Sequence, residues 1–79
     1  MNDKISLLST LEENEGGIII SLDNRGMLRR RLQDMGFVKG SRIVCVGKSP
    51  FGDPKAYMIK DTVIALRNSD TEKINIKKI

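Results

Sequence analysis

The segment AYMIKDTVIAL, residues 56–66, decides the fold class of this chain. Apolar and β-branched residues fill its two halves, 56–59 and 62–66, and only Lys60-Asp61 stands between them. Such runs are typical of β-strands, and a two-residue connection between two strands predicts a tight hairpin. Aspartate tolerates positive φ better than most residues, so Asp61 suits this turn.

Further strands are predicted on both sides of this hairpin. Three consecutive isoleucines begin residues 18–22, and they favour a strand that is buried on much of both faces. An apolar run also predicts a strand over residues 42–48, and the alternation of apolar and polar residues predicts a final strand over 74–76. Residues 69–72 have the spacing of a capping box, which predicts one helical turn before the last strand.

One helix is predicted over residues 24–35, inserted after the first strand. Asp23 or Asn24 offers a side chain for its N-cap, and Gly36 supplies the left-handed residue that ends a helix. In such an ending, Phe37 would pack back on the helix. Three side chains recur at helical spacing and form a narrow apolar stripe that would face the sheet: Leu28, Leu32 and Met35.

These elements predict a single domain that is mostly β with one inserted helix. The 79 residues leave no room for a second domain. We expect its core over about residues 17–77, and a polar lead-in over 1–15 that can hold a short helix. Five short strands can bury one face only by curling, so we expect a small five-stranded barrel, either SH3-like or OB-like.

The composition provides no catalytic or metal-binding constellation. The chain has no histidine and one cysteine, Cys45, which lies inside an apolar strand and is expected to be buried and inert. We therefore expect no enzyme activity, no cofactor and no metal site within one protomer. A lone cysteine, no long apolar run and no secretory signal at the N-terminus indicate a cytoplasmic protein.

The net charge of +4 could suit nucleic acid or an acidic protein surface. Basic residues cluster only at 29–31 and 77–78, and no aromatic residue is interleaved with either cluster. Because an electrostatic footprint on nucleic acid requires clustering, an ordinary solvated surface is the preferred interpretation.

Several short motifs along residues 17–77 resemble the FeoA family, accessory proteins of bacterial ferrous-iron uptake. They are LQDMG at 32–36, SPFGDP at 49–54, IALR at 64–67 and EKI at 72–74. Each is weak alone, and the order and spacing make the resemblance specific. We interpret the motif residues mainly as determinants of the fold: Leu32, Met35, Gly36, Gly40, Pro50, Gly52, Asp53, Pro54, Ala65, Leu66 and Arg67.

The resemblance implies an SH3-like barrel that docks on the cytosolic GTPase domain of a FeoB-type ferrous-iron transporter. Such a protein would meet the membrane only through the transporter, and it would be a monomer or a weak homo-oligomer. The resemblance also implies transition-metal binding, for which this sequence offers no histidine and a single cysteine. A similar module occurs in metal-dependent regulators, so a detached regulator domain is an alternative.

Two features do not reduce to the fold and are candidates for partner binding. Arg29 and Arg30 lie on the polar side of the predicted helix, and Phe51 stands at a loop tip beside a proline. A second alternative is a small barrel that binds nucleic acid by stacking bases on aromatic side chains. The chain has three aromatic residues for that purpose: Phe37, Phe51 and Tyr57.

Overall fold

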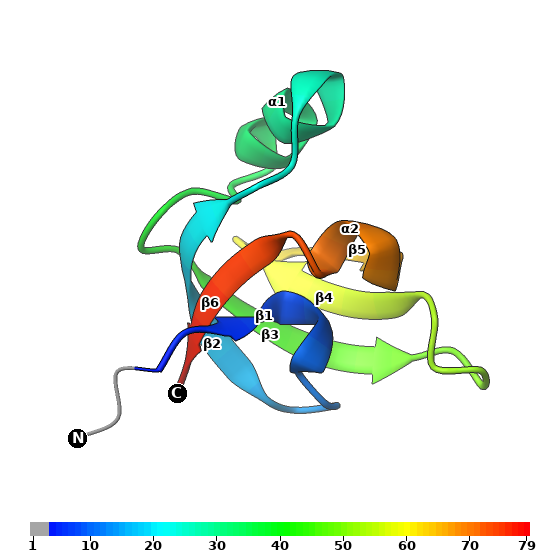
Figure 1. Ribbon diagram of the computed structural model, residues 1–79. Coiled ribbons are helices and arrows are strands. Elements are labelled where there is room, and N and C mark those ends of the chain that lie inside the picture. Colours follow the sequence, from blue (N-terminus) through cyan, green and yellow to red (C-terminus); the bar gives the residue numbers. More distant parts are fainter. Residues whose placement is uncertain (1–3) are drawn as a thin grey trace.

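The computed structural model describes residues 4–79, so the first three residues of the predicted lead-in lie outside the described part. Six strands form one antiparallel sheet in the order β1-β6-β2-β3-β4-β5, and the sheet curls around a single core (Figure 1). The strands are β1 (Ser6–Leu7), β2 (Gly16–Leu22), β3 (Arg42–Lys48), β4 (Lys55–Ile59), β5 (Thr62–Leu66) and β6 (Ile74–Lys78). The mostly-β prediction with one inserted helix is confirmed, and the two-residue β1 is a strand that the sequence did not predict.

The core is formed by alternate residues of the strands and by a few side chains from the helix and the lead-in. Its buried hydrophobic members are Leu8, Leu11, Ile19, Leu22, Leu32, Phe37, Ile43, Cys45, Tyr57, Ile59, Ile74 and Ile76. Three partly buried side chains pack against them: Leu28, Ile64 and Leu66. Burial of Cys45 agrees with the expectation of an inert thiol.

The predicted helix is α1 (Gly26–Asp34), and it is shorter at both ends than expected. Leu32 is fully buried and Leu28 packs against the core, but Met35 is 37% exposed, so its place in the apolar stripe was wrong. The prediction of Asp23 or Asn24 as the N-cap residue was also wrong, because Arg25 is at the N-cap and makes no side-chain hydrogen bond there. The helix begins two residues after Asn24, and the Asn24 amide donates to Asp70 O instead.

The C-terminal end of α1 has the predicted left-handed residue. Gly36 has a φ of 105°, its N–H donates to Gln33 O at 3.0 Å, and Phe37 N–H donates to Leu32 O at 2.9 Å. This pair of bonds is the Schellman motif, which satisfies carbonyls that the helix leaves free. Phe37 is buried in the same core as Leu32, as expected from this ending.

The β4–β5 hairpin agrees with its prediction. Ile59 pairs with Thr62, and the two turn residues between them, Lys60 and Asp61, have φ values of 48° and 65°. Positive φ at both positions defines the turn type whose twist matches that of the strands.

The lead-in contains the 3-10 helix η1 (Leu8–Thr10), and a lysine from the sheet holds it in place. Lys55 is 7% exposed, and its Nζ donates to Ser9 O at 2.7 Å and to Leu11 O at 2.9 Å. A buried ammonium group is tolerated only when hydrogen bonds replace its water. Lys55 thereby attaches the lead-in to β4.

The turn before β6 is α2 (Asn68–Thr71), which starts one residue before the predicted capping box. Its N-cap is Arg67, which makes no side-chain capping bond, so the capping-box prediction was wrong. Asp53 from the β3–β4 loop accepts the N–H of Asn68 instead, at 2.9 Å. No helix within residues 4–79 is long and apolar enough to cross a membrane.

Candidate docking site

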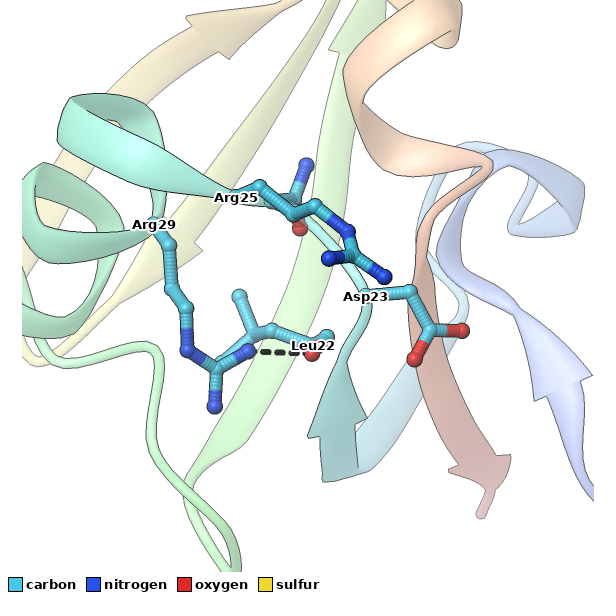
Figure 2. A pocket seen from close by; sticks show the side chains of 5 residues that line it. Leu22, Asp23, Arg25 and Arg29 are labelled. Carbon is cyan, nitrogen blue, oxygen red and sulfur yellow. Dashed lines mark hydrogen bonds between the residues drawn. The ribbon is translucent and has the colours of Figure 1, made fainter.

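A shallow pocket lies where β2 ends and α1 begins. Five consecutive or nearby residues line it: Leu22, Asp23, Asn24, Arg25 and Arg29. Figure 2 shows two guanidinium groups and one carboxylate around its opening. The pocket is therefore a polar surface with an excess of positive charge.

Long-range hydrogen bonds hold the backbone of this junction. Asp23 N–H donates to Lys73 O at 2.7 Å, and the Asp23 carboxylate accepts from Asn75 Nδ2 at 3.1 Å. Asn24 is only 3% exposed, and its Nδ2 donates to Asp70 O at 3.1 Å. These bonds tie the pocket to α2, to β6 and to the connection between them, which makes the pocket a rigid part of the domain.

The two arginines proposed from the sequence differ in structure. Arg29 is half-buried, and its guanidinium donates to Leu22 O across the pocket (Figure 2). Arg29 therefore has a structural partner, contrary to the sequence-based expectation. Arg30 is exposed, and its guanidinium makes no hydrogen bond or ion pair within residues 4–79.

Sequence reasoning missed Arg25. This residue is exposed, and its side chain extends over the pocket toward Asp23 without a hydrogen bond or ion pair in the described part of the chain (Figure 2). A cation at a helix N-terminus is opposed by the helix dipole, and α1 has no acidic residue in its first turn to offset it. Such an arginine is suited to an external carboxylate, which it can bind through two parallel hydrogen bonds.

Phe51 lies at the tip of the β3–β4 loop and is 95% exposed, so it does not tuck under its own loop. The β3–β4 loop and α1 lie at different ends of the molecule (Figure 1). The structure therefore does not bring Phe51 and the arginines together in one patch.

The described residues contain no group of three or more His, Cys, Asp or Glu side chains that could hold a metal ion. Two of the three aromatic side chains, Phe37 and Tyr57, are fully buried, which leaves Phe51 alone available for base stacking. Burial also raises the pKa of Tyr57 to about 12. The buried phenol is therefore a core residue with its proton retained.

The motif residues mostly support the fold. Gly36, Gly40 and Gly52 have positive φ, and the Asp53–Pro54 peptide bond is cis. Asp53 caps α2 through the Asn68 N–H. The remaining motif residues lie in α1 or at its C-cap, in the β3–β4 loop, and in β5 or directly after it: Leu32, Met35, Pro50, Ala65, Leu66 and Arg67.

A curled six-stranded sheet with one helix inserted after β2 defines a small domain of the SH3-like class. The chain matches the FeoA domain family over residues 7–78 and belongs to that family. It is 38% identical over 72 residues to a Fe(2+) transport protein A/Fe(2+) transporter FeoB fusion protein of Porphyromonas gingivalis. That match covers 91% of this chain and 8% of the fusion protein, so this chain spans a small part of its relative.

Solved structures show the same fold. FeoA of Chlorobium tepidum superposes with a TM-score of 0.88 at 26% identity, covering 94% of this chain and 70% of that protein. FeoA of Stenotrophomonas maltophilia, an SH3 domain protein complexed with zinc, has a TM-score of 0.81 at 29% identity, with 91% and 89% coverage. The SH3-like architecture is thus confirmed.

Proposed function

We propose that this protein is a non-enzymatic cytoplasmic accessory domain of ferrous-iron uptake, which docks on the cytosolic GTPase part of a FeoB-type transporter. One observation supports this assignment above the others: a relative 38% identical to this chain carries both FeoA and FeoB parts in one polypeptide. Covalent linkage holds two modules at a high effective concentration. Association of this domain with a transporter part also requires a contact surface on the domain itself.

The basic side of α1 is the first part of the proposed surface. Arg25 and Arg30 carry free guanidinium groups, and Arg29 is held beside them by Leu22. The planar fork of arginine pairs with carboxylates in a bidentate manner, which favours an acidic patch on the partner. We therefore assign charge recognition to this side of the helix.

Phe51 is the second part of the proposed surface. An aromatic side chain that is 95% exposed at a loop tip contributes nothing to the core of its own domain. Aromatic residues are enriched at the buried centres of interfaces, where they provide large contact areas. Because Phe51 lies away from α1, a partner that contacts both must wrap around the domain or contact them in separate steps.

Binding of this chain to the isolated cytosolic domain of the transporter tests the proposal. We expect the double variant Arg25→Glu, Arg30→Glu to slow association and to change its salt dependence, because rim charges act mainly on the approach of the partners. Phe51→Ser should mainly speed dissociation, since loss of an anchor acts on the bound state. Circular dichroism establishes that each variant is folded.

Two variants serve as matched controls. The double variant Lys39→Glu, Arg42→Glu reverses two exposed charges before and at the start of β3, and Ile79→Ser removes an exposed apolar side chain after β6. Both should bind like the parent chain. The proposed docking surface is wrong if the folded test variants also bind like the parent, and the proposed function fails if the parent itself does not bind.

A further inference from the structure

Among the described residues, the outer edge of β5 has no neighbouring strand. β5 ends the sheet, it is five residues long, and Thr62–Leu66 contains no charge, proline or register shift against β4. Natural proteins usually protect an edge strand with one of these devices or make it very short. The opposite edge follows the rule, because β1 has only two residues.

The hairpin geometry determines which backbone groups of β5 are free. Ile59 and Thr62 close a two-residue turn and so form a hydrogen-bonded pair, and such pairs alternate along an antiparallel ladder. The pairs formed by Ile64 and Leu66 with β4 are then hydrogen-bonded as well. The N–H and C=O groups of Val63 and Ala65 point away from β4, and they form no backbone hydrogen bond outside the strands.

We propose that this edge binds a second copy of the same chain, with the two β5 strands antiparallel and the two-fold axis at Ile64. In this register Val63 of each copy lies opposite Ala65 of the other. Both residues carry outward backbone groups, so all of the free groups of β5 are paired across the two-fold axis. The two sheets become one continuous sheet.

The charges at the ends of β5 select a second copy as the occupant. The same register places Asp61 of one copy opposite Arg67 of the other, twice by symmetry. Both side chains are exposed, and neither forms an ion pair within residues 4–79. A two-fold axis at Val63 or at Ala65 would instead set these charges opposite neutral residues.

The apolar side chains fit the same arrangement. Ile64 packs against the core but is only partly buried. In the dimer, Ile64 of one copy would lie opposite Ile64 of the other, and the two would form a non-hydrogen-bonded pair. Side chains approach each other most closely in pairs of this kind. On the outer face Val63 is 54% exposed beside Met58, its cross-strand neighbour. Pairing would cover part of this exposed apolar surface.

Sedimentation of the isolated chain over a range of concentrations tests this dimer without any transporter present. Arg67→Glu places two carboxylates opposite each other, and it should weaken dimerisation on the order of tenfold because like charges across a strand pair repel. The double variant Asp61→Lys, Arg67→Glu reverses both charges and should restore the dimer. Because aspartate tolerates the positive φ of position 61 better than lysine does, circular dichroism has to establish that this double variant is folded. Arg42→Glu, on β3, is the matched control and should leave the dimer unchanged.

Disulfide trapping tests the register. The Cα atoms of a non-hydrogen-bonded pair are about 4.5 Å apart, which is within the range that a disulfide spans. Ile64→Cys should therefore form a covalent dimer on mild oxidation, whereas Val63→Cys alone should not. If Ile64→Cys does not fold, a mixture of Val63→Cys and Ala65→Cys chains should yield the mixed dimer.

A chain that stays monomeric up to about millimolar concentration, or a dimer that Arg67→Glu leaves unchanged, overturns the proposal. Binding to the transporter is measured separately, so either proposal can fail alone.

Discussion

The Asp53 carboxylate accepts the backbone N–H of Asn68 at 2.9 Å and so joins the β3–β4 loop to the first residue of α2. The first N–H groups of a helix have no partner within it, and a side-chain oxygen usually satisfies one of them. Here the residue at the N-cap, Arg67, makes no such bond. An aspartate distant in sequence performs the capping, which couples the loop that carries Phe51 to the turn before β6.

Asp53→Ala should lower the free energy of unfolding by about 0.5–2 kcal/mol, the usual effect of losing a helix cap. Asp53→Asn keeps an acceptor oxygen at the same position and should cost less. Urea denaturation of the two variants compares them directly. Equal losses would show that the capping bond is not the reason for the effect.

Leu32→Ala should lower the free energy of unfolding by about 2–4 kcal/mol, because it opens a cavity in a small core where Leu32 is fully buried. Met35→Ala is the matched control, since Met35 is 37% exposed one turn away. Its effect should be clearly smaller. Thermal or urea unfolding measures both, and similar losses would contradict the observed face of α1.

Gly36→Val should destabilise the domain by about 1 kcal/mol or more, because a β-branched residue is strained at positive φ. Any added Cβ would also meet Lys60 Cδ at 2.8 Å, which the flexible lysine side chain can relieve only by moving. Gly36→Asn should be milder, since asparagine visits the left-handed region. Gly47→Ala, at a site with open space, is the control. Unfolding free energies that are equal for the two Gly36 variants would contradict the helix-ending argument.

Tyr57 should titrate far above the ordinary range of tyrosine. Burial raises its pKa from 10.0 to about 12, so the folded chain keeps the proton that the unfolded chain loses first. The stability contributed by the protonated phenol is therefore complete below pH 10 and is lost between pH 10 and about 12. Tyr57 is the only tyrosine and tryptophan is absent, so tyrosinate absorbance reports this group alone.

Tyr57→Phe provides the control for that titration. Its unfolding free energy should fall less steeply above pH 10, because the variant has no phenol that the unfolded chain can deprotonate. An ordinary pKa for Tyr57, or identical slopes for the two proteins, would contradict burial as the cause.

The local elements were predictable because their signals lie within a few consecutive residues. Lys60-Asp61 between two apolar runs is sufficient for a hairpin, and Gly36 after the helical pattern is sufficient for the left-handed ending. The helix start was not predictable in the same way. Asn24 is a good N-cap residue by type, but its amide donates to Asp70 O, a contact between distant segments.

The candidate site was only partly predictable for the same reason. Arg29 and Arg30 are neighbours in a basic cluster, and the sequence does not tell which of them has a backbone carbonyl within reach. The fold places Leu22 O beside Arg29 and leaves Arg25 and Arg30 free. Phe51 was predicted at a loop tip, and its exposure is consistent with that prediction.

By itself the sequence determined the hairpin, the end of α1 and the mostly-β class, because backbone conformation and turn chemistry are local properties. Only the tertiary structure decided which polar groups are buried, which are hydrogen-bonded and which remain open. The Lys55 ammonium is buried against η1, the Asp53 carboxylate caps α2, and the backbone N–H and C=O of Val63 lie on an open sheet edge. Each outcome depends on which distant segment approaches, and a buried polar group is stable only where that approach provides its hydrogen-bond partner.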